Sequence, residues 1–455
     1  MTRRQAISRR NFLACTVAAV TAFPCIRSYG QAATPPSEQF RFAKIACGGM
    51  GGGDLANTVK GGGTLVAMCD VDPKRAEKAY QQYPDIPKFT DYRKMLDKVE
   101  KEIDGVVVST PDHTHAVAAL DAMRRGKHVY VQKPLARTFE ECRLMLEASR
   151  KYKVVTQMGN QGHAGSGLIL WKKMMDANAF GDILEVHTWS NRPIWPQGMT
   201  QAPAAEPTPE GMDWDMWIGP AEMRPFSSAY APFKWRGWWD FGCGAMGDMA
   251  CHNMDPAFWI LKLGLPTYIK CEASAPAGIA YPDWSIIEYK FPATPVCPNG
   301  VKMIWYDGKK LPPQPANVNP QLKLGDNGCL IVGSKMTAVG GSHAGAPLPI
   351  ALGKEPYGPA VKEVERQWRE ELKQTQGCNH YGQWVEACKE HNPAKPGSNF
   401  EYSVPMTQAI LLGCLALKFP GKELKWDSAK REFTNLPEAN KWLSSKPRAG
   451  YVLSA

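Results

Sequence analysis

The stretch KIACGGMGGGDLANTVKGGGTLVAMCDVD, residues 44–72, decides the fold class. A short apolar segment runs into a glycine-rich turn, a helical stretch closes on further glycines, and a second apolar segment ends in acidic residues. This order predicts a strand, a turn, a helix and a second strand, which is the repeating unit of a parallel, doubly wound sheet. A glycine-rich turn that opens a helix lets the backbone approach a pyrophosphate group.

This turn predicts a dinucleotide site. It contains Gly48, Gly49, Met50 and Gly51. Gly48 and Gly51 match the second and third glycines of the fingerprint G-x-G-x-x-G, and Ala46 stands at the first, where alanine fits if its φ angle is negative. Asp70 ends the second strand about 20 residues later, where a carboxylate accepts both ribose hydroxyls and repels a 2′-phosphate. The pattern favours NAD over NADP. The alternative is a fold that kept its glycines without the cofactor.

Strands and helices alternate up to residue 158. Strands are expected in 104–110, 128–134 and 153–159, and helices in 73–83, 115–126 and 138–152. The last of these helices begins with a capping box, Thr138 with Glu141. Beyond residue 160, Trp, Pro and Gly become dense, strands follow one another in tandem, and a helix is expected over 244–264.

The predicted fold class is therefore α/β, with two domains. A Rossmann domain with a doubly wound parallel sheet is expected at 41–158. A substrate-binding α+β domain with a large, open, mostly antiparallel sheet is expected at 159–430, and a C-terminal tail at 431–455 is expected to pack on both domains.

The first 32 residues predict an export signal. Arg9 and Arg10 precede the apolar run 12–23, which is too short to span a bilayer, and Gly-Gln-Ala follows at 30–32. The paired arginines resemble a twin-arginine signal, whose partner is the Tat translocation machinery. An ordinary secretory signal is the alternative. We expect a periplasmic protein without a stable membrane anchor, and a linker at 33–40.

Composition excludes several classes of protein. The 455 residues carry a formal charge of +10, but five arginines fall in the first 32 residues, and no block of five or six like charges occurs. Nothing therefore predicts a nucleic acid or an anionic membrane as partner. Two of the 13 cysteines fall in the leader, and the others show no C-x-x-C spacing, so neither a disulfide framework nor a zinc site is expected.

The stretch STPDHTHAVAALDAMRRGKHVYVQKPLA, residues 109–136, resembles the Gfo/Idh/MocA oxidoreductases, and the resemblance extends over 41–430. The family's Glu-Lys-Pro hallmark reads Gln132-Lys133-Pro134 here, and its Asp-x-x-x-His hallmark matches Asp248 and His252. The resemblance implies that Lys133 points at the nicotinamide and the substrate, and the departure to Gln132 bears only on the exact tuning of that lysine. It also implies a homo-oligomer, a dimer or a tetramer.

A helix over 244–264 would place Asp248, His252 and Asp255 on one face. Removing a hydride from a sugar carbinol requires a base for the hydroxyl proton, and imidazole suits that task near neutral pH. We expect His252 to be the general acid/base, Lys133 a proton relay or electrostatic partner, and Asp248 an orienting group or second substrate ligand. Asp255 is expected to contact substrate. A metal site and a helix surface without function are the alternatives.

Further residues are assigned by analogy with the family or by their chemistry. Thr110, Pro111, His115, Asn160 and Gln161 are expected to line the cofactor, as are Gln132 and Lys133. A metal pair formed by His113 and His115 is the alternative for that segment. Arg192, Trp195 and Arg236 lie in aromatic loops and are expected to line the sugar pocket, because aromatic faces stack on sugar C–H surfaces; ordinary packing is the alternative. We expect no metal ion.

An exported enzyme must carry its NAD with it, because the periplasm has no replenished pool. We therefore expect tightly bound NAD in an oxidoreductase that acts on a hydroxyl of a sugar, glycoside or polyol. A second hypothesis is a redox-neutral, NAD-dependent glycosidase or lyase that works by transient oxidation at C3 and elimination. Glycosidases related to the family carry a Tyr/His pattern instead of these hallmarks, which favours the dehydrogenase. A third hypothesis is a non-catalytic sugar-binding protein.

Overall fold

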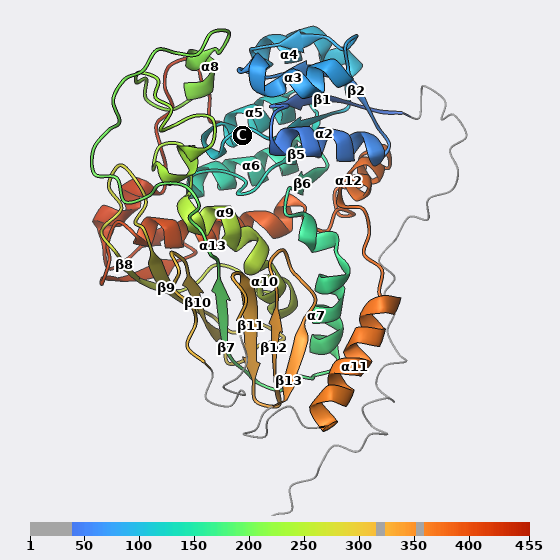
Figure 1. Ribbon diagram of the computed structural model, residues 1–455, viewed down its shortest axis with the longest axis vertical. Coiled ribbons are helices and arrows are strands. Elements are labelled where there is room, and N and C mark those ends of the chain that lie inside the picture. The colour runs from blue at the N-terminus through green and yellow to red at the C-terminus, as the bar shows by residue number, and fades with distance from the viewer. Residues whose placement is uncertain (1–38, 315–323, 352–358) are drawn as a thin grey trace, which may run out of the picture.

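The computed structural model describes residues 39–314, 324–351 and 359–455 (Figure 1). The predicted twin-arginine signal and most of the predicted linker lie outside the described residues. Among the helices of the described ranges, none has the length and apolarity needed to cross a membrane.

The chain from residue 40 to residue 158 forms a parallel sheet with the strand order β3-β2-β1-β4-β5-β6. Its strands are β1 (Phe40–Ile45), β2 (Gly63–Cys69), β3 (Lys88–Phe89), β4 (Gly105–Val108), β5 (His128–Val131) and β6 (Thr156–Met158). Its helices are α2 (Met50–Lys60), α3 (Pro73–Gln82), α4 (Tyr92–Val99), η2 (Glu100–Glu102), α5 (Asp112–Arg124) and α6 (Phe139–Tyr152). This is the doubly wound order of a Rossmann domain, as predicted.

Local signals in the sequence set the ends of these helices. The Thr138 side chain accepts from the Glu141 backbone N–H while the Glu141 carboxylate accepts from the Thr138 backbone, so the predicted capping box is confirmed. The Asp72 carboxylate accepts from the backbone N–H of Arg75 and begins α3. Such caps satisfy backbone groups that a helix terminus leaves without partners.

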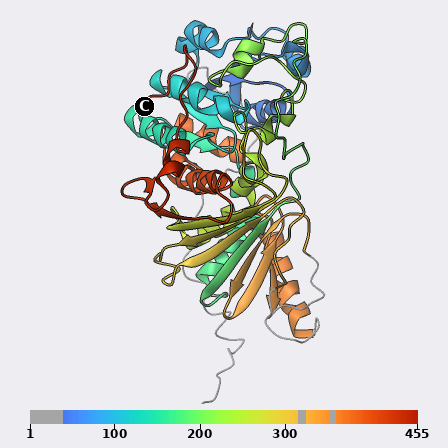
Figure 2. The same ribbon diagram turned by 90° about the vertical axis from the view of Figure 1, so that its left-hand side faces the viewer.

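The chain beyond residue 160 builds a broad, twisted sheet below the Rossmann domain (Figure 2). Within the described residues its strand order is β13-β12-β11-β7-β10-β9-β8-β14-β15, and every pair is antiparallel except β7 with β10. The strands are β7 (Ile183–Trp189), β8 (Tyr268–Ala273), β9 (Ser285–Phe291), β10 (Val301–Tyr306), β11 (Gly328–Gly333), β12 (Met336–Gly340), β13 (Leu348–Ala351), β14 (Glu423–Asp427) and β15 (Glu432–Phe433). The predicted fold class, including the large, mostly antiparallel sheet, is confirmed.

The helices beyond residue 160 are η3 (Gln161–Ala164), α7 (Ser166–Asp176), α8 (Trp214–Ile218), η4 (Lys234–Gly237), α9 (Gly244–Asn253), α10 (Asp255–Leu261), α11 (Pro359–Gln374), α12 (His380–Lys389), α13 (Phe400–Ala416) and η5 (Pro437–Trp442). The single helix expected over 244–264 is instead two, α9 and α10, separated at Met254. Pro256 lacks the N–H that would continue the hydrogen-bond ladder of α9, which explains the break.

Segments from beyond residue 160 also pack against the Rossmann domain. Helix α12 packs on α2 and β1. The segment between β7 and α9, which carries α8, lies beside the Rossmann helices (Figure 1). In this segment the backbone N–H of Asp213 donates to the Val71 carbonyl at 2.8 Å. The tail adds an ion pair between Arg448 and Asp215, 2.6 Å apart. Residue 158, where β6 ends, therefore separates the two domains along the sequence, but segments beyond it still pack against the Rossmann domain.

Candidate functional site

The glycine turn between β1 and α2 forms one end of the site. Gly51 has no room for a side chain, because a Cβ there would lie 2.1 Å from the Ala46 carbonyl oxygen. Gly49, at φ 56° and ψ −125°, adopts a conformation open only to glycine. Ala46 itself has φ 63°, so the condition under which alanine would fit this position, a negative φ angle, is not met. The chain enters the turn in the left-handed region, at a strain cost of roughly 1–2 kcal/mol for alanine.

Asp70 shapes this turn as well as facing the cavity. Its Oδ2 accepts from the backbone N–H groups of Cys47 at 2.7 Å and Gly48 at 3.2 Å, and its Oδ1 accepts from Asp72 at 3.0 Å. A carboxylate has about four acceptor positions. Three are used here, so Asp70 keeps room for about one ribose hydroxyl rather than the two we expected.

One cavity of about 410 Å³ joins the glycine turn to Lys133 and Asp248, two of the three predicted catalytic residues; His252 is not part of its lining. The predicted site residues that line it are Gly48, Gly49, Met50, Asp70, Thr110, Pro111, Gln132, Lys133, Arg236 and Asp248. Among the described residues, the Thr110 hydroxyl is buried without a hydrogen-bond partner. The close turn, the Asp70 carboxylate and this free hydroxyl all fit a dinucleotide lying along the cavity.

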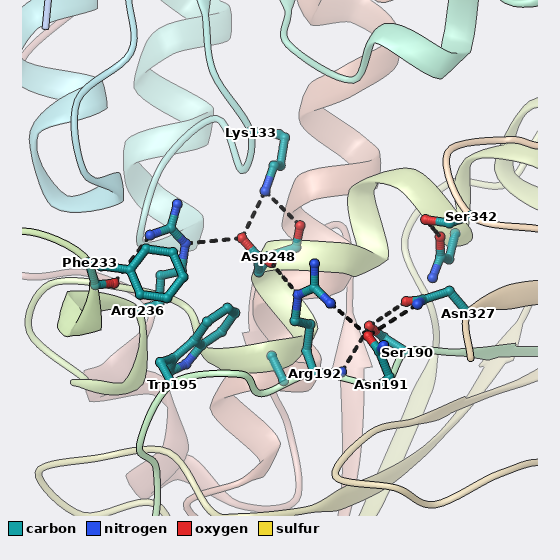
Figure 3. A network of polar contacts seen from close by, with 12 residues as sticks. Lys133, Ser190, Asn191, Arg192, Trp195, Phe233, Arg236, Asp248, Asn327 and Ser342 are labelled. Carbon is teal, nitrogen blue, oxygen red and sulfur yellow. Dashed lines mark hydrogen bonds and ion pairs between the residues drawn. The ribbon is translucent and has the colours of Figure 1, made fainter. Parts of the chain in front are cut away.

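Three cations surround the carboxylate of Asp248 at the far end of the cavity (Figure 3). Lys133 Nζ donates to Asp248 Oδ1 at 2.9 Å and to its backbone carbonyl at 2.7 Å. Arg236 Nε donates to Oδ1 at 3.2 Å, and Arg192 Nε lies 3.7 Å from Oδ2. Burial alone would raise the pKa of Asp248, but Lys133 and Arg236 lower it to about 2. Asp248 is therefore ionised and holds the ammonium group in place.

Gln132, where the family carries glutamate, is explained by a buried partner that the sequence did not reveal. Its Nε2 lies 3.0 Å from each carboxylate oxygen of Asp54 on α2. Asp54 also accepts from Ser109 at 2.5 Å and from Tyr381 at 2.7 Å. An amide can donate to this carboxylate, whereas a second carboxylate would repel it. Because the Lys133 backbone N–H lies 3.3 Å from Gln132 Oε1, the network also supports the lysine.

His252 lies on α9, one turn beyond Asp248, and is buried. Burial lowers its pKa well below the ordinary value, and Lys133 and His343 lower it further. The ring is therefore neutral at neutral pH and able to accept a proton. Its Nδ1 is buried without a hydrogen-bond partner among the described residues. A ring from outside the predicted site, that of His343, packs on it with centroids 4.0 Å apart.

Several predicted site residues form buried contacts with other parts of the protein around the site. The nitrogens of His115 lie 2.8 Å from the Pro134 and Thr110 carbonyls, so this buried ring connects the segments after β5 and β4. Asp255, which we expected on the substrate, accepts from His163, Asn160 and Tyr402 in a buried cluster outside the cavity lining.

The remaining candidates also lie around the site. Gln161 donates to the hydroxyls of Tyr130 and Tyr381, 3.1 and 3.0 Å away. Trp195 is nearly buried, donates to Gln197, and packs under the Arg236 guanidinium, whose carbon lies 5.7 Å from the ring centre. For Trp195 this geometry supports packing at the rim of the site (Figure 3).

The two metal alternatives gain no support. Among the residues that the structure describes, no group of three His, Cys, Asp or Glu side chains could hold a metal ion. His113 Nε2 lies 3.0 Å from the Trp217 carbonyl, so its ring is engaged in the packing below α8.

Sequence reasoning missed cavity residues that arrive from distant segments. They are Arg75, Asp112, Met212, Met216, Trp217, Phe233, Trp235 and Tyr451. Arg75 lies across the glycine turn, with Nη2 2.9 Å from the position of a Cβ on Gly49. Its position on the first turn after β2 was the only sequence signal available for it. Asp112 begins α5, directly after the predicted Thr110 and Pro111. The others come from residues 212–235, around α8 and η4, and from the tail, and no local pattern indicates that these segments reach the cavity.

The fold and the cavity define a protein with a Rossmann-type dinucleotide site and a second, separate domain. The Rossmann-fold model of the Gfo/Idh/MocA oxidoreductase family, described as NAD-binding, matches residues 40–160, and the model of the family's C-terminal alpha/beta domain matches 171–310. The two models together cover more than half of the chain, and this protein belongs to the Gfo/Idh/MocA oxidoreductase family.

Individual relatives agree with this assignment. The inositol 2-dehydrogenase of Salmonella paratyphi B is 32% identical over 135 residues, 29% of this chain and 39% of that protein. The levoglucosan dehydrogenase of Pseudarthrobacter phenanthrenivorans is 27% identical over 195 residues, 43% of this chain and 42% of that protein. Each alignment thus covers less than half of the relative. The WlbA dehydrogenase from Bordetella pertussis, solved with NADH and UDP-GlcNAcA, matches 86% of this chain and 98% of its own at TM-score 0.60 and 19% identity.

Proposed function

We propose that this protein is an NAD-dependent oxidoreductase that oxidises a hydroxyl group of a sugar, glycoside or polyol. The observation that carries the proposal is the single cavity of about 410 Å³ that runs from the glycine turn to the Lys133–Asp248 ion pair. The relatives named for inositol and levoglucosan support the polyhydroxylated class of substrate.

Lys133, at the far end of the cavity, and the buried His252 on α9 can carry out the proton half of this reaction. Oxidation removes a hydride from the carbinol carbon and a proton from its oxygen, and leaves a carbonyl group. When bound, NAD supplies the nicotinamide carbon that accepts the hydride. Lys133 uses two of its three hydrogens on Asp248, which leaves one to polarise the substrate oxygen. The neutral His252 accepts the hydroxyl proton.

The proposal includes location and assembly. We infer that residues 1–32 direct a folded, NAD-loaded protein through the Tat machinery to the periplasm, where it works as a homo-oligomer. To stay loaded for hours, NAD must dissociate at a rate on the order of 10⁻⁴ s⁻¹. With association near 10⁶ M⁻¹s⁻¹, that corresponds to a dissociation constant of about 10⁻¹⁰ M.

Mass spectrometry of the denatured protein tests the cofactor first. Stoichiometric NAD released from protein as purified supports the proposal, and an empty protein with weak NAD affinity contradicts it. The loaded protein is then incubated with free sugars, polyols and aryl glycosides. Absorbance at 340 nm together with a keto-sugar supports the oxidoreductase, whereas aglycone release without added cofactor points to the redox-neutral glycosidase. Lys133→Met and His252→Ala should keep the NAD and lose turnover.

A further inference from the structure

A loop from the distant edge of the second sheet reaches the predicted catalytic histidine. It joins β12 to β13 and includes residues 341–347. His343 and Ala344, neither of them glycine, have φ angles of 58° and 54°. Two successive left-handed residues are costly, and such strain is kept mainly where the surrounding structure and function require it.

Glycines on the neighbouring segments make this docking possible. A Cβ on Gly162 would lie 2.0 Å from the His343 carbonyl oxygen, and a Cβ on Gly167 would lie 2.2 Å from that of Ala344. Gly162 belongs to η3 and Gly167 to α7, the segments that follow the last Rossmann strand. The loop is therefore fitted closely against the junction of the two domains.

The loop presents the His343 ring to His252. The ring centroids are 4.0 Å apart and the planes are inclined by 30°, although His252 is buried and His343 is exposed. Burial lowers the pKa of His343, the charges of Lys133 and Arg192 lower it further, and Asp248 raises it. Both imidazoles are therefore neutral at neutral pH, and the exposed residue His343 stands beside the predicted base.

A chain of hydrogen bonds determines which nitrogen of His343 carries its proton. Asn253 Nδ2 donates to the Trp189 carbonyl at 2.7 Å, so Asn253 presents Oδ1 to Ser342. The Ser342 hydroxyl must then donate to Oδ1, 3.2 Å away. Because that hydrogen is used, Ser342 Oγ accepts from His343 Nδ1, 2.6 Å away. A neutral imidazole with its proton on Nδ1 has its lone pair on Nε2.

We propose that His343 is a substrate-binding residue whose Nε2 accepts a hydrogen bond from a second hydroxyl, on the carbon next to the one that is oxidised. This role rests on the proposed function, because it assigns the substrate class of the same site. Two neighbouring imidazoles with centroids 4.0 Å apart, each neutral and so with one acceptor nitrogen, match a vicinal diol, with one hydroxyl for His252 and its neighbour for His343. A substrate lacking the second hydroxyl leaves that acceptor without its partner.

Nitrogen NMR of histidine-labelled protein tests the proposal without turnover. The NAD-loaded protein should show His343 as the Nδ1–H tautomer, and Ser342→Ala should convert part of it to Nε2–H. Myo-inositol, levoglucosan and glucose are then titrated in, and at least one should shift the Nε2 signal of His343. An Nε2–H tautomer in the parent protein, or no shift with any of the three, overturns the proposal. The failure of all three to be oxidised would count against the proposed function alone.

Kinetics supply a readout that a structural role would not move. His343→Phe keeps a ring for the stack and removes the acceptor, so kcat/KM for an oxidised diol should fall about tenfold, the cost of about one hydrogen bond. For the deoxy analogue that lacks the neighbouring hydroxyl, parent and variant should be equal. An equal fall for both compounds overturns the proposal.

A matched control is available at the end of α12. His391 is likewise exposed, has φ 49°, and packs on a buried histidine, His128, at 5.5 Å. His391→Phe should leave kcat/KM unchanged for both the diol and its deoxy analogue. A tenfold fall in kcat/KM for the diol in this variant as well would overturn the assignment to His343.

Discussion

Replacing Gln132 by glutamate, the residue that the family hallmark carries at this position, is expected to destabilise this protein. Gln132 Nε2 lies 3.0 Å from both oxygens of the buried Asp54 carboxylate, and Gln132→Glu would place a carboxylate oxygen there. Asp54 already accepts from Ser109 and Tyr381, so it is held in place and cannot turn away.

The distance decides how the variant responds. Two unit charges about 3 Å apart repel by about 5–6 kcal/mol at an effective dielectric constant of about 20. Keeping the introduced glutamate protonated at pH 7 costs less, about 3.7 kcal/mol from its ordinary pKa of about 4.3. The protonated carboxyl also donates to Asp54 as the amide did. The folded variant should therefore take up a proton and lose about 4 kcal/mol of unfolding free energy at pH 7.

The loss should depend on pH with a definite sign. The folded-state pKa of the introduced carboxyl is raised, so the native state holds the extra proton and the penalty shrinks as pH falls, to about 1.6 kcal/mol at pH 5.5. Urea unfolding at pH 7 and 5.5 measures this for the parent, Gln132→Glu, Asp54→Asn and the double variant. The double variant, with one carboxylate and one amide, should recover part of the loss. A deficit that is absent at pH 7, or equal at both pH values, would refute the reasoning.

Three further outcomes are expected. Gly51→Ala should release NAD, because the new Cβ would lie 2.1 Å from the Ala46 carbonyl oxygen. Gly53→Ala, whose Cβ would have nothing within 4 Å, should keep NAD and gain about 0.5–1 kcal/mol of unfolding free energy. NAD content and urea unfolding measure both variants. Burial raises the pKa of Asp112 to about 7, so the parent loses stability as pH rises from about 4 to 7, and Asp112→Asn should gain about 1.5 kcal/mol at pH 5 and about 4 kcal/mol at pH 8 by urea unfolding. An equal gain at both pH values would contradict that pKa. Lys133→Met should lower kcat by about 10²- to 10⁴-fold in rapid-mixing assays of NADH formation, with NAD content unchanged.

Local patterns in the sequence were sufficient to predict the class of fold. Strand and helix periodicity, glycines at the turn and the cap of α6 all act within a few residues, and the structure confirms the parallel sheet that they predicted. The ion pair of Lys133 with Asp248 does not follow from local patterns, because 115 positions separate the two residues. The sequence indicated them only separately, as two hallmarks of a family. The sequence did not reveal the positive φ angle of Ala46, because the turn imposes its own angle on whichever residue stands there.

Tertiary structure alone decided which groups surround these hallmarks. The partner of Gln132 lies 78 positions away on α2, and His343 reaches His252 from a loop whose sequence carries no catalytic signature. The Asp255 carboxylate, on the helix expected to carry it toward substrate, is instead bound by three side chains from distant elements. A sequence pattern records interactions between near neighbours along the chain. The charge of a buried group and the proton on a ring nitrogen depend on neighbours in space, and only the folded chain brings these together.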